Sequence, residues 1–263
     1  MRVAAIQHDI AWEDGAATRE RLTPMISQAA AGGARLITVT EMYATGFSMK
    51  PEAIAEAPGG PNETFLAEHA VAHQVWLIGS VAQWADSASP DEPVTESQTR
   101  RATNTAIVAG PNGERFRYDK IHPFSYADEH LHYQGGQDRL SVTIDDLRVS
   151  VFICYDLRFA DEFWPMAPTT DLYVVPANWP EPRRDHWQTL LRARAIENQA
   201  YVIGCNRVGR VDRVNYVGDS AIIDPLGHVL SQASVAETVL FADVEAEQVQ
   251  RVRARFPFLA DRR

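Results

Sequence analysis

The stretch VSVFICYDLRFADEFW, residues 149–164, decides how the rest of the sequence is interpreted. Its first five residues are apolar except for one serine, which is typical of a strand buried in a core. The run ends at Cys154, and Tyr155, Asp156 and Arg158 follow at once. A core cysteine explains this thiol, since free cysteines are commonly buried. A nucleophile at the mouth of a sheet also explains it.

Segments on either side of this stretch alternate between strand-like and helix-like patterns. Strands are expected at residues 3–7, 36–39, 75–81, 105–108, 115–118, 140–144, 148–153, 172–175, 201–205, 218–223, 228–230 and 238–244. Helices are expected at residues 22–30, 64–73 and 185–198, and the first is limited or bent by Pro24 and stopped by Gly32 and Gly33. This alternation predicts an α/β protein with one domain over residues 1–263.

Composition excludes several classes of partner. The formal net charge is −10, and no basic stretch offsets it, which argues against nucleic acid and anionic membranes. No run approaches the roughly 18 apolar residues of a membrane span, and the N-terminus does not resemble a signal peptide. With only two cysteines, Cys154 and Cys205, we expect a reduced, cytoplasmic protein rather than a disulfide framework. No phosphate loop or dinucleotide fingerprint is present, so no cofactor is expected.

Three strand-like runs end in reactive side chains: LITVTE ends in Glu41, RFRYDK in Lys120 and VSVFIC in Cys154. Ligands of α/β sheets gather outside the carboxyl ends of strands, so these three residues are expected to converge. A thiol needs a base, and a positive charge favours the thiolate. Glu41 supplies the base, and Lys120 supplies the charge and a donor to an oxyanion. One of the eight histidines remains an alternative base.

These residues lie in blocks that resemble a known family. VTEMYATGFS, YDKIHPFSYADEH and FICYDLRF resemble the three signature blocks of the nitrilase (carbon–nitrogen hydrolase) superfamily, in the same order. PANWPEPRRDHW, RARAIENQAYVIGCNRVG and VGDSAIIDPLG most resemble the bacterial omega-amidases, which act on the terminal amide of 2-oxoglutaramate and similar acids. The resemblance implies a four-layer αββα sandwich, a Glu41–Lys120–Cys154 catalytic set, no metal and a homodimer.

The family often carries a second glutamate after the lysine, which orients that lysine and the substrate. Glu129, in YADEHLHYQGG, matches this position best, and Asp128 is the alternative. One departure from the family is the polar segment DSASPDEPVTESQTRR, residues 86–101, which is expected to be an exposed excursion between strands. Pro123 is a smaller departure, where the family more often has an aliphatic residue.

The remaining candidates surround the expected pocket. The backbone N–H of Tyr155 is expected to be a second oxyanion donor, although its ring has no assigned role beyond packing. Arg158 is expected to pair with Asp156 or Asp161, or to bind an anionic substrate. Arg183 and Arg184 are either solvated or bind a substrate carboxylate in bidentate fashion, and Arg183 is the preferred ligand of the two. Trp179 is either a pocket wall or core.

Three histidines lie close together in the loop after Lys120: His122, and the H-x-H pair His130 and His132. No third and fourth ligand with suitable spacing accompanies that pair, so a zinc site is not expected.

Together these features predict a thiol amidase that hydrolyses a small linear amide through a thioester on Cys154. The substrate implied by the resemblance is the terminal amide of a 2-oxo acid such as 2-oxoglutaramate or 2-oxosuccinamate. Nitrile hydrolysis, aliphatic amide hydrolysis, N-carbamoyl hydrolysis or acyl transfer on the same fold are alternatives. A non-catalytic binding protein is an alternative from another class.

Overall fold

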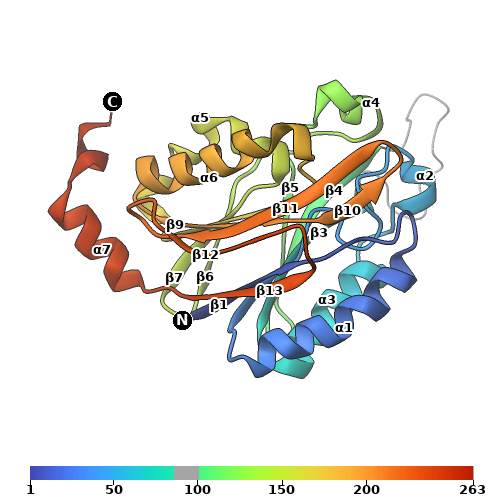
Figure 1. The fold of residues 1–263 in the computed structure, drawn as a ribbon, viewed down its shortest axis with the longest axis horizontal. Coiled ribbons are helices and arrows are strands. Elements are labelled where there is room, and N and C mark those ends of the chain that lie inside the picture. The colour runs from blue at the N-terminus through green and yellow to red at the C-terminus, as the bar shows by residue number, and fades with distance from the viewer. Residues whose placement is uncertain (86–100, 263) are drawn as a thin grey trace.

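The structure is a computed structural model that describes residues 1–85 and 101–262. Most of the excursion predicted at residues 86–101 therefore lies outside the described residues. Two β-sheets pack face to face, and helices cover their outer faces (Figure 1). The predicted four-layer αββα sandwich is confirmed by this arrangement.

The first sheet has six strands in the order β13-β1-β2-β3-β4-β5. Their bounds are Thr238–Asp243, Arg2–Gln7, Leu36–Thr38, Trp76–Trp84, Ala102–Ala109 and Arg115–Asp119. Both faces are buried, because alternate side chains enter different clusters: Val3 and Ala5 pack toward the second sheet, and Ala4 and Ile6 pack toward the outer helices. This explains why the strands read as continuous apolar runs.

The second sheet has the order β10-β11-β9-β8-β7-β6, and β12 pairs with β11. These strands span Val208–Val211, Val214–Ile223, Tyr201–Asn206, Leu172–Ala177, Leu147–Val151, Leu140–Ile144 and Val229–Ser234, respectively. Strands β7, β8 and β9 run parallel, as β1, β2 and β3 do in the first sheet. The parallel part of each sheet therefore offers a carboxyl edge where loops can converge.

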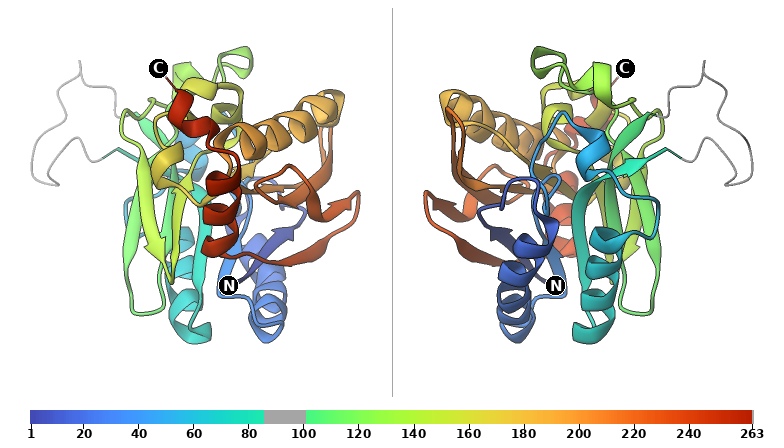
Figure 2. Two further views of the ribbon diagram at one scale, coloured as in Figure 1. Left: turned by 90° about the vertical axis from the view of Figure 1, so that its left-hand side faces the viewer. Right: turned by 90° about the vertical axis from the view of Figure 1, so that its right-hand side faces the viewer.

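Helices α1 (Gly15–Ala31) and α3 (Pro61–His73) cover the first sheet, and α6 (Arg184–Asn198) covers the second. Figures 1 and 2 show α6 on the opposite side of the two sheets from α1 and α3. The shorter helices are α2 (Pro51–Ile54), α4 (Glu129–His132) and α5 (Ala160–Phe163), and α7 (Ala246–Arg255) follows β13.

One expectation about helices is corrected, and one longer helix was not predicted. Pro24 does not limit α1, which runs through it, because the buried face around Leu22, Ile26 and Ala29 stabilises the helix despite one lost hydrogen bond. Helix α7 was not predicted, because it buries only Ala246, Val249 and Val252 and is otherwise polar. Within the described residues, no helix is long and apolar enough to cross a membrane.

Candidate active site

Glu41, Lys120 and Cys154 meet at the carboxyl edge of the two sheets. Glu41 follows β2, Lys120 follows β5 directly and Cys154 follows β7. The Lys120 Nζ donates to Glu41 Oε1 at 2.9 Å and to Glu129 Oε2 at 2.8 Å. Both glutamates are fully buried, and Lys120 is 1% exposed. Residues from distant parts of the sequence thus form one buried charged group.

Lys120 remains an ammonium ion in this environment. Burial lowers its pKa, but the negative charges of Glu129 and Glu41 outweigh burial, and the net pKa is raised. The ring of Phe47 lies over the Nζ, which is 5.0 Å from the ring centroid. Phe47 therefore shields the ammonium group from solvent and adds a cation–π contact.

Cys154 sits at a sharp turn between β7 and a short 3-10 segment, with a φ of 45°. A positive φ is uncommon for a residue with a side chain and is often found at functional sites. Asp156 stabilises the turn, because its carboxylate accepts hydrogen bonds from the backbone N–H groups of Ile153 and His122 and from the Tyr118 hydroxyl. The turn is consequently tied to the segment that follows Lys120.

The Cys154 thiol is protonated at rest. Burial raises its pKa well above the usual value, and the Glu41 carboxylate raises it further, whereas Lys120 and the backbone N–H of Asn178 act in the opposite direction. Lys120 favours the thiolate, as expected, but burial and the Glu41 carboxylate outweigh its effect on the pKa. A protonated thiol beside a carboxylate is an arrangement suited to general base catalysis.

Asn178, which follows β8, fixes the position of Glu41. Its backbone N–H donates to Glu41 Oε2 at 2.8 Å, and its side-chain Nδ2 donates to the Glu41 carbonyl at 2.5 Å. Glu41 Oε1 is occupied by Lys120 and by Asn104. The carboxylate is therefore held from several sides and has little freedom to rotate.

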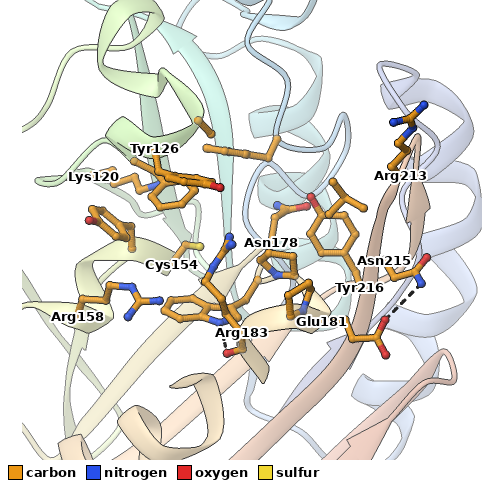
Figure 3. Close-up of a pocket in the computed structure, with 18 residues that line it drawn as sticks. Lys120, Tyr126, Cys154, Arg158, Asn178, Glu181, Arg183, Arg213, Asn215 and Tyr216 are labelled. Carbon is orange, nitrogen blue, oxygen red and sulfur yellow. Dashed lines mark hydrogen bonds between the residues drawn. The ribbon is translucent and has the colours of Figure 1, made fainter. Parts of the chain in front are cut away.

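A cavity of about 460 Å³ opens above Cys154 and Lys120 (Figure 3). Its other lining residues are Phe47, Phe124, Tyr126, Ala127, Tyr155, Arg158, Asn178, Trp179, Pro180, Glu181, Pro182, Arg183, Arg213, Val214, Asn215 and Tyr216. None of the eight histidines, all of which are described, is among them. The alternative of a Cys154–histidine pair thus has no support in the structure.

Arg158 faces this cavity and does not form the expected ion pair. Its guanidinium lies over the Trp179 ring, 4.7 Å from the centroid, and contacts His186 Nδ1 at 3.1 Å. The Asp156 carboxylate is occupied by other donors, and no ion pair joins Arg158 to a carboxylate within the described residues. Burial lowers the pKa of Arg158, and the nearby Arg183 lowers it further.

Arg183 and Arg184 have different surroundings. Arg184 pairs with Asp219 at 2.9 Å. Arg183 lines the cavity, where its guanidinium lies over the rings of Phe124 and Tyr126 at 5.4 and 5.9 Å. The structure therefore places Arg183, rather than its neighbour, where a cavity ligand can reach it. Trp179 is nearly buried and forms part of the cavity wall, and its Nε1 donates to the Arg183 carbonyl at 2.8 Å.

The remaining candidates are placed as follows. Glu129 is buried against Lys120, whereas Asp128 is exposed. Tyr155 lines the cavity beside Cys154, and its ring contacts Phe124 and Phe159. In the part of the chain that the structure describes, no three histidine, cysteine or acidic side chains gather in a way that could hold a metal ion.

Three polar residues that support the site, Asn104, Asn178 and Asp156, were not predicted from the sequence. All three are buried: Asn104 and Asn178 donate hydrogen bonds to Glu41, and Asp156 holds the turn at Cys154. The signal for Asn104 was an amide inside the apolar strand ATNTAIVA, because a buried polar side chain requires a partner. No pattern in the sequence identified the partner.

Comparisons with known proteins identify the family of this chain. The model of the carbon–nitrogen hydrolase family matches residues 2–254. The chain is 34% identical to omega-amidase YafV of Escherichia coli K12, over 99% of this chain and 96% of that protein. It is 32% identical to 2-oxoglutaramate amidase of Bacillus subtilis, over 87% and 85%.

A solved structure is similar over the whole chain. It is a CN-hydrolase superfamily protein from Xanthomonas campestris with an arsenic adduct in its active site. It is 33% identical, the match covers 100% of this chain and 97% of that one, and the TM-score is 0.90. This chain belongs to the carbon–nitrogen hydrolase family, and it is a hydrolase that acts on the carbon–nitrogen bonds of amides.

Proposed function

We propose that this protein is an omega-amidase, which hydrolyses the terminal amide of a small 2-oxo acid to the dicarboxylate and ammonia. One observation carries the proposal. The buried Glu41–Lys120–Glu129 group and the Cys154 thiol open into a cavity that also presents Arg158 and Arg183, neither of which is paired with a carboxylate within the described residues.

The first half of the reaction forms a thioester. Glu41 takes the proton of the Cys154 thiol while the sulfur attacks the amide carbon, and the carbonyl electrons move to oxygen. Lys120 Nζ and the backbone N–H of Tyr155 stabilise the resulting oxyanion. When the intermediate collapses, the carbon–nitrogen bond breaks and Glu41 returns its proton to the leaving nitrogen. Ammonia departs, and the acyl group remains on Cys154.

The second half returns the enzyme to its starting state. Glu41 removes a proton from a water molecule, whose oxygen attacks the thioester carbon. The second oxyanion uses the same donors, Lys120 and Tyr155. The carbon–sulfur bond then breaks, the sulfur regains the proton from Glu41, and the carboxylic acid product leaves. Glu129 keeps Lys120 directed toward the oxyanion throughout.

The charged residues at the mouth of the cavity favour an acidic substrate. Arg158, Arg183 and Arg213 line it, against one carboxylate, that of Glu181. A guanidinium forms bidentate hydrogen bonds with a carboxylate, and binding one relieves the mutual repulsion of Arg158 and Arg183. A 2-ammonium group gains nothing from this excess of positive charge, so a 2-oxo acid is favoured over the corresponding amino acid.

The test is ammonia release from a matched panel of substrates by the purified protein. The panel contains 2-oxoglutaramate, 2-oxosuccinamate, glutamine, an uncharged aliphatic amide, an N-carbamoyl amino acid and a nitrile. The proposal predicts a kcat/KM for the 2-oxo amides at least about tenfold above that for glutamine, because the ammonium group of glutamine is repelled by the arginines of the cavity. Preference for the uncharged amide, the carbamoyl compound or the nitrile contradicts the substrate assignment.

A thiol-reactive electrophile separates an enzyme from a binding protein on the same fold. Cys154 borders the cavity, whereas Cys205 is fully buried. We expect the reagent to modify Cys154 rapidly and to leave Cys205 unmodified. Absence of turnover across the panel, together with equally slow labelling of both thiols, contradicts the catalytic assignment.

A further inference from the structure

Asn104 lies between the two glutamates that contact Lys120. It belongs to β4 and is 1% exposed. Its Nδ2 donates to Glu41 Oε1 at 2.8 Å and to Glu129 Oε1 at 3.2 Å. Its backbone carbonyl accepts a hydrogen bond from the Lys120 backbone N–H at 2.9 Å, so the strand pairing itself keeps Asn104 beside Lys120.

These contacts close a ring in which donors and acceptors alternate. Lys120 Nζ also donates to the same two oxygens, at 2.9 Å for Glu41 Oε1 and 3.1 Å for Glu129 Oε1. Each Oε1 atom thus faces one charged donor and one neutral donor. Two buried carboxylates this close share a proton unless donors separate them, as in aspartic protease dyads. The amide of Asn104 provides the second separating donor.

The orientation of the Asn104 amide is fixed by its own partner. Ser80 Oγ accepts a hydrogen bond from the Met42 backbone N–H at 2.8 Å, and its hydroxyl donates to Asn104 Oδ1 at 2.8 Å. The carbonyl end of the amide must therefore face Ser80, and the NH₂ end must face the glutamates. Met42 directly follows Glu41, so the same chain of hydrogen bonds also holds the backbone of the proposed base.

We propose that Asn104 is a positioning residue that keeps Glu41 and Glu129 ionised together, so that Glu41 is free to accept the Cys154 proton. The inference rests on the proposed thiol amidase function. Every hydrogen-bonding partner of the Glu129 carboxylate, namely Lys120, Asn104 and the Phe124 N–H, is a donor. Burial and the charge of Glu41 raise the pKa of Glu129, whereas Lys120 and the Phe124 N–H lower it. A proton on the carboxylate would point at one of the three donors, which opposes the effect of burial. Without the Asn104 amide, the Oε1 atoms of Glu41 and Glu129 would lose their shared neutral donor, and a proton shared between them would replace it.

Other titratable groups also face the ring. They are Cys154 and Asp156 in the turn after β7, Tyr133 after α4 and Tyr216 on β11. The pKa values of Cys154, Tyr133 and Tyr216 are raised, and the pKa of Lys120 is raised as well, so these four groups keep their protons at neutral pH. Asp156, with a pKa of about 6, titrates in wild type and variants alike.

The test compares pH profiles of kcat/KM for the wild type, Asn104→Leu, Ser80→Ala and Thr103→Val. Leucine fills the space of asparagine without donors. Thr103 is the matched control, because it lies next to Asn104 on β4 but its hydroxyl contacts Thr105 rather than a glutamate. We expect Asn104→Leu to lower kcat/KM at neutral pH about 10- to 100-fold, the usual loss on removing a buried orienting partner.

We also expect the acid limb of the Asn104→Leu profile to move upward by about 1 pH unit, the scale of one lost charge-stabilising contact. Ser80→Ala should move it in the same direction by less, and Thr103→Val should leave it in place. A fall in kcat/KM at every pH with an unmoved acid limb overturns the proposal, since a merely structural role predicts that result. Thermal unfolding of each variant identifies any that fails to fold. If Asn104→Leu does not fold, the shift of the acid limb in Ser80→Ala decides the question.

A second measurement separates this inference from the proposed function. The rate of Cys154 alkylation by iodoacetamide, followed against pH, reports proton transfer to Glu41 without amide turnover. An inactive wild type contradicts the proposed function. Slower alkylation in Asn104→Leu, with the loss greatest on the acid side, still supports the role of Asn104, and an unchanged alkylation profile contradicts it.

Discussion

Cys154 and Cys205 are both buried free thiols associated with the second sheet, but their surroundings differ. Cys205 lies within β9, where its thiol donates to the carbonyls of Ile6 and Thr38 at 3.3 and 3.4 Å. Cys154 lies beyond the end of β7, at a positive φ, beside Glu41 and a cavity. Burial does not distinguish the proposed nucleophile from a core thiol, whereas the adjacent Glu41 carboxylate and the cavity do.

Removing the base should make Cys154 behave like Cys205. Glu41→Gln keeps the shape of the side chain but cannot accept a proton, so we expect kcat to fall about a thousandfold. Steady-state kinetics with 2-oxoglutaramate measure this loss. Glu52→Gln, on the exposed side of α2, is the matched control and should retain wild-type kcat. Turnover in Glu41→Gln within a few-fold of the wild type contradicts the assignment of Glu41.

Substitution of Arg183, the proposed partner of the substrate carboxylate, tests the second feature, the opening for substrate. Arg183→Ala should raise KM for 2-oxoglutaramate about 10- to 100-fold, because a hydrogen bond to a charged group contributes about 1.5–3 kcal/mol. Turnover of an uncharged amide should change little. Arg192→Ala is the control, since Arg192 is exposed on α6 and is absent from the cavity lining. Equal losses for both substrates contradict carboxylate recognition by Arg183.

Removing Cys205 should affect stability rather than catalysis. Cys205→Ala loses two long thiol hydrogen bonds and leaves a small gap, so we expect the free energy of unfolding to fall by about 1 kcal/mol. Denaturant unfolding measures this change, and kcat should stay at the wild-type value. A large loss of kcat in a stably folded Cys205→Ala protein means that the two thiols are not functionally distinct.

At rest the two thiols should be alike in ionisation. Burial raises the pKa of both, and for Cys154 the Glu41 carboxylate raises it further, so each thiol keeps its proton as pH rises to about 9. Ultraviolet thiolate absorbance of the wild type minus that of Cys154→Ala should therefore stay flat between about pH 6 and pH 9. A titration step below pH 8 in this difference shows a preformed thiolate and contradicts general base activation.

Much of this account was accessible from the sequence, because it depended on local patterns. Two-sided burial gave each inner strand an apolar run, and the reactive residues at three strand ends stood out against those runs. The contact between Lys120 and Glu129 was expected on resemblance, and the structure places Glu129 there. The ion pair expected between Arg158 and Asp156 or Asp161 is not formed, because other donors occupy the Asp156 carboxylate, which sequence proximity does not reveal. The other expected role of Arg158, binding of an anionic substrate, stays a prediction.

The sequence did not show the contacts between residues that are distant in the chain. The Nδ2 group of Asn104 reaches Glu41, 63 positions away, and the backbone of Asn178 reaches the same carboxylate from 137 positions away. The first contact depends on the order of strands within the first sheet and the second on the packing of the two sheets, and no local periodicity reports either. The same reason explains why the raised pKa of Cys154 was not foreseen.

The most direct test of the account is ammonia release from 2-oxoglutaramate by three proteins measured side by side: the wild type, Cys154→Ala and Cys205→Ala. The account predicts rapid release by the wild type, comparable release by Cys205→Ala, and none above the uncatalysed rate by Cys154→Ala. Release by Cys154→Ala at a rate near that of the wild type would contradict the thioester mechanism and the assignment of Cys154 as the nucleophile.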